Sequence, residues 1–214
     1  MNAGAALLAA LLASALLPQD STPRNPVATP AGTSAPVRRV TSRYDSYFRK
    51  YSKRYFGPTY DWRLFKAQAM AESNLVPTAR SSAGARGLMQ LMPSTYAAIA
   101  STRPDYAAID DPQSNIGAGI RHDRDLWNIW VDHVTADDQD RFMFGSYNAG
   151  EMTIVRARVA AKRAQLDPAE WGSVVQVAPK VPRWRYRETL GYVTTIEANY
   201  AILVPRATTV ATAH

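Results

Sequence analysis

One acidic residue, Glu72, combines a chemical type and a position that suit proton transfer. Trp62, Phe65 and Ala69 recur at three- and four-residue steps, and Glu72 follows on the same stripe, seven residues after Phe65. This spacing places all four residues on one face of a helix running from Trp62 to Ser73. The carboxyl group of Glu72 is therefore expected to point toward a core.

The end of this helix should raise the pKa of Glu72. Asp61 fits the N-cap position, and Pro77 disfavours helix for the residue before it, so the helix should end within a turn of Glu72. Desolvation and the negative end of the helix dipole both disfavour the anion there, as general acid chemistry near neutral pH requires. The structural alternative is a Glu72 that faces solvent or pairs with an arginine such as Arg80 or Arg86.

Two segments that follow carry polar residues able to contact a ligand. The loop SSAGARG contains two glycines, and LMQLMP then presents Gln90 and Met92 with few charges nearby. Further on, Phe144, Tyr147 and Asn148 share a helix face at i, i+3 and i+4, so Tyr147 should point inward with a hydroxyl that needs a partner. The Asn-Ala-Gly sequence would end or bend that helix and expose polar groups that a ligand could use.

The C-terminal segment VAPKVPRWRYRETLGYV offers a third set of contacts. Its prolines indicate an ordered irregular loop, and its aromatic side chains either stack on sugar rings or cover the core; these are Trp184, Tyr186 and Tyr192. Glu188 should begin the last helix, Thr189 to Val204. A carboxylate is favoured at that helix end, so Glu188 either caps the helix or contacts substrate.

Four blocks of this chain resemble the successive motifs of the soluble-type lytic murein transglycosylases. They are Glu72-Ser73, Gly87-Leu88-Met89-Gln90-Leu91-Met92-Pro93, Ser146-Tyr147-Asn148-Ala149-Gly150 and Glu188-Thr189-Leu190-Gly191-Tyr192-Val193. The flanking segments most resemble the catalytic domain of the membrane-bound lytic murein transglycosylase F group. The resemblance covers roughly residues 42 to 204.

The resemblance implies a mainly α, lysozyme-like fold with about seven or eight helices around a glycan groove. It implies a lyase that cleaves the β-1,4 bond between N-acetylmuramic acid and N-acetylglucosamine without water and leaves 1,6-anhydromuramyl ends. Glu72 would be the catalytic acid and then base, and Tyr147 would help orient its carboxyl group. The remaining matched positions would shape or contact the groove: Ser73, Ser81, Gln90, Met92, Asn148 and Glu188.

A single catalytic carboxyl group departs from the usual glycosidase pair. Asp105, Asp110 and Asp111 are candidates for a second acid by residue type only. One acid is sufficient where the substrate's own N-acetyl group assists, and the resemblance implies this course. No cofactor is implied. Two alternatives remain: a goose-type-lysozyme-like muramidase that hydrolyses the same bond, and a non-catalytic cell-wall-binding module.

Cysteine is absent from the 214 residues, which excludes disulfides, thiol chemistry and a lipobox anchor. Three histidines without a ligand-like spacing give no support for a metal site, and His122 and His133 are expected at the surface. The hydrophobic content of 46% is ample for the core of one domain.

The N-terminal region predicts export to the periplasm or cell envelope. Residues 1–18 contain an apolar run, shorter than a membrane span, that resembles a secretory signal, although no Lys or Arg precedes it and no clean A-x-A site follows. Residues 19–36 are rich in Pro, Ser and Thr and should form a flexible linker. A lysozyme-like domain is expected at 37–206, and a disordered tail at 207–214.

A basic helix face is expected near the start of the domain. Apolar and aromatic residues between Val40 and Tyr55 follow helical spacing, while Arg and Lys take the other positions. This face is either simply solvated or attracts a polyanion, in keeping with the formal net charge of +7. No nucleic-acid-binding pattern occurs, whereas peptidoglycan carries stem-peptide carboxylates that a basic protein would attract. In line with the resemblance, the expected partner is peptidoglycan glycan strands. Cell-envelope machinery stays open as a further partner, and the sequence does not determine the oligomeric state.

The other helices are expected at Thr95–Ser101, from Asp111-Pro112 toward Trp130, and at 139–150, 151–166 and 168–175. No run alternates apolar and polar residues as a strand would. In the family, the helix that follows Asp111 usually carries an aromatic-leucine pair after its glycines, where this chain has Arg121-His122-Asp123. We expect a core helix at this position nonetheless.

Overall fold

The computed structural model describes residues 40–204. The signal-like segment at 1–18, the linker at 19–36 and the tail at 207–214 lie outside these residues. The outermost positions of the expected domain, 37–39 and 205–206, lie outside them too.

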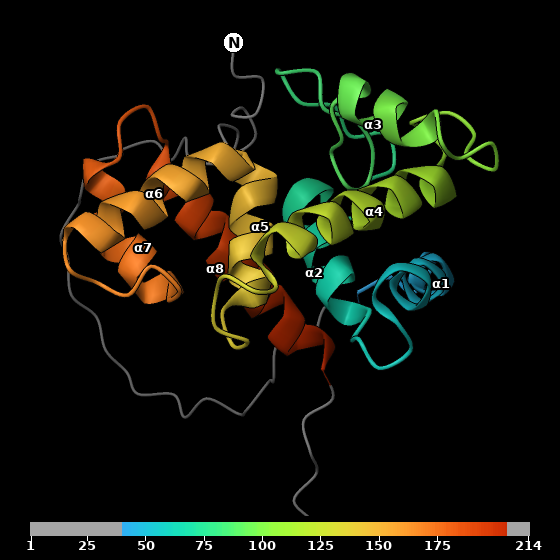
Figure 1. Cartoon of the computed structure of the whole chain (residues 1–214). Helices are drawn as coiled ribbons and strands as arrows, with labels where there is room; N and C mark the ends of the chain where they lie inside the picture. Colours follow the sequence, from blue (N-terminus) through green and yellow to red (C-terminus); the bar gives the residue numbers. More distant parts are fainter. Residues whose placement is uncertain (1–39, 205–214) are drawn as a thin grey trace, which may run out of the picture.

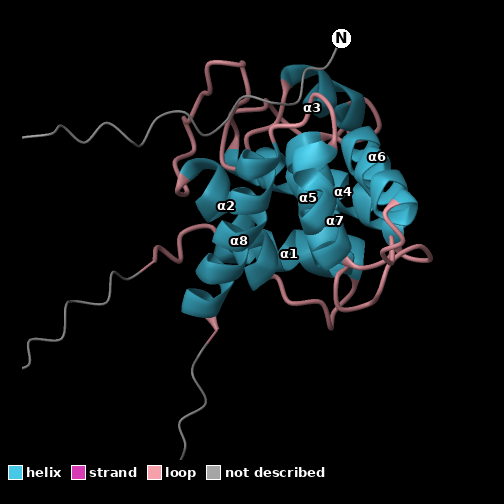
Figure 2. Ribbon diagram, turned by 90° about the vertical axis from the view of Figure 1, so that its left-hand side faces the viewer, coloured by secondary structure: helices cyan, strands magenta, loops and turns pink. Residues whose placement is uncertain are grey.

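Eight α-helices and one short 3₁₀ helix make up the described part of the chain. They are α1 Asp45–Phe56, α2 Arg63–Ser73, α3 Pro93–Ala100, α4 Pro112–Trp130, α5 Gln139–Ala149, α6 Glu151–Arg163, α7 Trp171–Val177, η1 Ala178–Lys180 and α8 Tyr186–Leu203. Figure 2 shows helices and loops but no strand between residues 40 and 204. The prediction of a mainly α chain with seven or eight helices is therefore confirmed.

Some helix ends differ from the sequence prediction. Trp62, not Asp61, is the N-cap of α2, although Asp61 Oδ1 still accepts the Arg63 N–H at 3.0 Å. Helix α8 begins at Tyr186, so Glu188 lies inside its first turn rather than before it. By contrast, α4 begins as predicted, because Asp111 caps it by accepting the Ser114 N–H at 2.8 Å.

Three helices occupy the middle of the molecule. Figure 1 shows α2, α5 and α8 between α1, α3 and α4 on one side and α6 and α7 on the other. Helix α2 packs along α8, and α5 packs against both α4 and α8. Large side chains that are almost completely buried fill the space between them, among them Phe65, Trp130, Phe142 and Tyr192. Helix α4 is the core helix that was expected, and Asp123 in its unusual triplet is fully buried.

The long loop between α2 and α3, residues 74–92, is held to α4 by one side chain. Asn115 Oδ1 accepts the Met89 N–H at 2.8 Å, and Asn115 Nδ2 donates to the carbonyls of Arg86 at 3.0 Å and Ile109 at 2.9 Å. Gly87 passes so close that a Cβ atom there would lie 2.3 Å from Asn115 Nδ2. Two isolated β-bridges, Arg80 with Arg86 and Arg86 with Leu91, order the loop locally, and the contacts of Asn115 fix it to α4.

Asn115→Ala should destabilise the protein by about 3 kcal/mol, because it removes three hydrogen bonds to backbone groups and leaves the Met89 N–H and the Ile109 carbonyl without this partner. Urea unfolding measures this loss. Asn128→Ala is the matched control, since Asn128 is exposed on the same helix and its replacement should cost less than about 0.5 kcal/mol. Equal losses in the two variants would contradict this account of the loop.

Candidate active site

Glu72 lies in the last turn of α2 and is partly buried. The chain turns directly after it, since Asn74 is left-handed with a φ of 51°, and its N–H returns to the carbonyls of Ala69 and Met70. The prediction that the helix ends within a turn of Glu72 is confirmed. The carboxyl group thus lies at the end of α2 where the helix dipole disfavours an anion.

The polar partner of Glu72 comes from the far end of the chain. The Tyr192 hydroxyl donates to Glu72 Oε1 at 2.5 Å, across 120 residues of sequence. Tyr192 belongs to α8, and its side chain is buried. The packing of α2 along α8 therefore creates this contact.

Burial dominates the electrostatics of Glu72. Removal of water raises the pKa of Glu72 to about 8, although the hydrogen bond from Tyr192 acts in the opposite direction. The same burial, together with the negative charge of Glu72, raises the pKa of Tyr192 well above its ordinary value. At neutral pH both groups therefore carry their protons, and Glu72 can act as an acid.

The arginine pairing considered as an alternative for Glu72 does not occur. Arg86 forms an ion pair with Asp110, and Arg80 contacts the same carboxylate at 3.3 Å. The two other candidate second acids are also engaged elsewhere. Asp105 pairs with Arg103, and Asp111 caps α4.

Two predicted site residues hold the loop segment that follows Glu72. Ser73 Oγ donates to the Leu88 carbonyl at 2.8 Å, and the Tyr147 hydroxyl donates to the Met89 carbonyl at 2.7 Å. With Asn115 on the Met89 N–H, three helices bind consecutive backbone groups of this segment. Tyr147 therefore acts on the loop, while the hydroxyl that meets the carboxyl of Glu72 belongs to Tyr192.

The side chain of Gln90 also binds backbone groups of the loop. It is buried, its backbone is left-handed with a φ of 46°, and its Nε2 donates to the carbonyls of Gly87 at 2.8 Å and Ala79 at 3.1 Å. The structure thus brings Gln90, Ser73 and Tyr147 together around one loop, and Ser73 is the direct neighbour of Glu72 in the chain.

The remaining predicted residues lie in the loop 74–92 or near helix ends. Ser81 Oγ accepts the Ala85 N–H at 3.0 Å and closes its own loop rather than contacting the acid. Met92 is the N-cap residue of α3, and Asn148 is partly exposed beside Tyr147 in the last turn of α5. Glu188 lies in the first turn of α8, 3.1 Å from Arg185 Nε.

Sequence reasoning did not identify Tyr192 as a partner of Glu72. The sequence predicts that Tyr192 and Trp184 either stack on sugar rings or cover the core, and the structure buries both, with Trp184 Nε1 donating to Thr189 Oγ1 at 2.9 Å. The sequence feature that could have pointed to Tyr192 as a site residue is its position one helical turn after Glu188 in the fourth block. That spacing places both residues on one face of α8.

His122, which is expected at the surface, is partly buried, whereas His133 is exposed as predicted. The His122 ring lies 5.2 Å from the ring of Tyr147, and burial lowers the pKa of His122. His122 is thus a neutral neighbour of the site. Tyr147 keeps its proton too, because burial and the charges of Asp123 and Glu72 raise its pKa well above the ordinary value.

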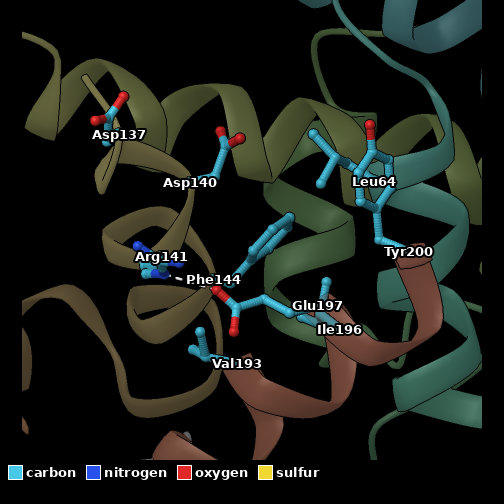
Figure 3. A pocket seen from close by; sticks show the side chains of 9 residues that line it. All are labelled: Leu64, Asp137, Asp140, Arg141, Phe144, Val193, Ile196, Glu197 and Tyr200. Carbon is cyan, nitrogen blue, oxygen red and sulfur yellow. Dashed lines mark hydrogen bonds and ion pairs between the residues drawn. The ribbon is translucent and has the colours of Figure 1, made fainter. Parts of the chain in front are cut away.

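A separate pocket of about 320 Å³ opens between α2, α5 and α8. Figure 3 shows Arg141 and Glu197 joined across it, with Phe144 and Val193 nearby. None of the predicted site residues lines this pocket. Between residues 40 and 204, no group of three or more metal-binding side chains is arranged around a common point, and no helix is long and apolar enough to cross a membrane.

Comparison with known proteins identifies the family. Residues 46–168 match the family model of the Transglycosylase SLT domain. The chain belongs to this family. Its curated relatives include the membrane-bound lytic murein transglycosylase F of Maricaulis maris, 32% identical over 159 residues, and that of Pseudomonas putida strain W619, 32% identical over 150 residues. These alignments cover 73% and 69% of this SLT-domain chain.

A solved structure shares the fold. The 70 kDa soluble lytic transglycosylase of Escherichia coli superposes with a TM-score of 0.59 at 25% identity, over 77% of this chain. The lysozyme-like fold expected from the sequence is thereby confirmed. The chain spans about a third of the length of the two curated relatives, 33% and 29%, and 24% of the solved protein.

The raised pKa of Glu72 predicts a pH-dependent stability. The folded pKa is near 8 and the ordinary value is 4.5, so this contribution to stability is complete below about pH 4.5 and is lost as the pH rises toward 8. Glu72→Gln removes the titrating group. The free energy of unfolding of Glu72→Gln relative to wild type should therefore increase steadily from pH 5 to pH 8 in urea titrations. Parallel curves for the two proteins would show that the carboxyl group is not desolvated.

Proposed function

We propose that this SLT domain is a peptidoglycan lytic transglycosylase. It cleaves the β-1,4 bond between N-acetylmuramic acid and N-acetylglucosamine without water and releases 1,6-anhydromuramyl products. The observation that carries this proposal is the desolvated Glu72, protonated at neutral pH and held by Tyr192. The names of the curated relatives support the same activity.

Glu72 supplies both proton transfers in the proposed reaction. Tyr192 binds Oε1, so Oε2 carries the proton that passes to the bridging oxygen as the bond to N-acetylglucosamine breaks. The N-acetyl group of the muramyl sugar stabilises the anomeric carbon, in place of a second carboxylate. The Glu72 carboxylate then takes the proton from the muramyl O6 hydroxyl, which closes onto C1. Glu72 ends the cycle protonated, and no cofactor is needed.

The loop 87–93 supplies the polar surface beside the acid. Ser73 and Tyr147 fix its carbonyl groups, so its remaining groups can meet the sugar in a constant position. We assign substrate contacts to Ser73, Ser81, Gln90, Met92, Tyr147, Asn148 and Glu188. For Gln90 the side-chain carbonyl is the group left for such a contact, because Nε2 binds the loop.

Two other functions use the same fold. A muramidase would protonate the same oxygen and then admit water to C1. A wall-binding module would bind glycan without cleavage, but it would not need a desolvated carboxyl group at this site. The single acid favours the lyase, because a muramidase needs a base that activates water. Asp105 and Asp110 are instead bound by arginines, and Asp111 caps α4.

Glu72→Gln should lower the release of soluble fragments from purified sacculi at least a thousandfold, because the amide keeps the shape and has no acidic proton. Glu170→Gln is the control, since Glu170 is exposed before α7. Mass spectrometry of the wild-type products should find anhydro ends, each lighter by one water than a hydrolysed end. Hydrolysed ends would identify a muramidase, and the absence of fragments would identify a binding module.

The exposed basic face of α1 fits an acidic polymer. It comprises Arg49, Lys50, Lys53 and Arg54, and its aromatic residues pack inward at Phe48 and Tyr51. Arg49 also lies over the Trp62 ring at 4.6 Å. Peptidoglycan carries stem-peptide carboxylates, so this face would hold the wall near the enzyme by long-range attraction.

Replacing Lys50 and Lys53 together by Gln should weaken binding to sacculi several-fold at low salt and leave little difference above about 0.5 M salt, where charges are screened. The control is Lys162→Gln with Arg163→Gln, which removes the same charge from the exposed end of α6. Sedimentation with sacculi measures the bound fraction. Equal weakening by both pairs would mean that net charge, not the α1 face, determines binding.

A location in the cell envelope follows from this substrate. We propose that residues 1–18 direct export to the periplasm and that residues 37–206 make up the catalytic domain. Cell fractionation with N-terminal sequencing of the mature protein tests the export proposal.

A further inference from the structure

A second buried carboxyl group lies behind Glu72. Gln68 and Glu72 are four residues apart on α2 and so share a face of the helix. Gln68 Nε2 donates to Asp123 Oδ1 at 3.1 Å, and both side chains are fully buried. This hydrogen bond ties α2 to α4 one helical turn from the acid.

Each member of this pair has one further polar atom that lacks a partner among the described residues. These atoms are Gln68 Oε1 and Asp123 Oδ2. Both atoms are acceptors if Asp123 is ionised, and a buried carboxylate with one neutral donor carries a large desolvation cost. A proton on Oδ2 makes that atom a donor. The protonated carboxyl group of Asp123 can then donate its O–H to the side-chain carbonyl of Gln68, while the Gln68 amide N–H donates to the carbonyl oxygen of Asp123.

The groups that face Asp123 also disfavour its negative charge. Burial and the charges of Glu72 from α2 and Asp140 from α5 raise the pKa of Asp123 well above its ordinary value, against the opposing hydrogen bond from Gln68. Burial and the charge of Asp123 both raise the pKa of three tyrosines, so all three keep their protons. They are Tyr60, Tyr147 from α5 and Tyr192 from α8. The adjacent His122 is held neutral by burial. No cation compensates Asp123 among the groups that act on it.

We propose that Asp123 stays protonated in the folded protein and forms a two-hydrogen-bond ring with Gln68 that positions α2, and with it Glu72. The positioning role rests on the proposed function of Glu72, whereas the protonation of Asp123 does not. A neutral Asp123 also spares the site a second negative charge behind the proton donor.

Infrared spectroscopy at pH 7 tests the protonation. In a Glu72→Gln background, the further change Asp123→Asn should remove one protonated-carboxyl C=O band from the spectrum. Asp125→Asn in the same background is the control and should remove none, since Asp125 pairs with Arg121 near the surface of α4. An unchanged protonated-carboxyl region after Asp123→Asn, with loss of a carboxylate band instead, would overturn the proposal.

Activity tests the positioning role. Asparagine can reproduce both hydrogen bonds of the neutral acid, whereas alanine reproduces neither. Asp123→Ala should lower kcat on sacculi at least tenfold with KM little changed, and Asp123→Asn should recover most of that loss. Circular dichroism ensures that folded variants are compared. If Asp123→Asn is as inactive as Asp123→Ala, the positioning role is overturned. If the wild-type protein has no wall activity but the infrared change is observed, only the proposed function is refuted.

Discussion

The desolvation of one carboxyl group is the constraint on which the rest of the site depends. A buried carboxylate is costly, so the fold shifts Glu72 toward its protonated form instead of supplying a cation. The single hydrogen bond from Tyr192 opposes that shift and leaves the pKa near 8. A group with this pKa can give up a proton and recover it within one reaction cycle. One residue can therefore serve as both acid and base.

The surrounding structure desolvates this group and places no counter-charge beside it. Arginines that are near in sequence are held by Asp110, and α8 covers the carboxyl with a buried tyrosine. The loop beyond the acid has hardly any regular structure, yet side chains from α2, α4 and α5 bind its backbone at Leu88 and Met89. The arrangement of the candidate site thus comes from buried polar contacts between distant segments. Such contacts are costly to break, because each broken one leaves a polar group without a partner.

The sequence predicted what local periodicity controls. The stripe Trp62, Phe65, Ala69 and Glu72 correctly predicted the helix α2, its end and the inward direction of the carboxyl group. Local periodicity does not predict which side chains from distant segments come into contact. Nothing in the pattern of α8 shows that Tyr192 meets Glu72, since that contact depends on how α8 packs along α2. The buried Asp123 was likewise unpredictable, because a polar triplet on a helix normally indicates an exposed face.

The titration of Glu72 itself tests the central claim most directly. Carbon-13 NMR of protein labelled at the glutamate carboxyl groups follows each ionisation, and the signal missing from Glu72→Gln identifies this residue. The account predicts a midpoint near pH 8. A midpoint near the ordinary value of 4.5 would show that Glu72 is ionised at neutral pH, and it would contradict the assignment of Glu72 as the proton donor.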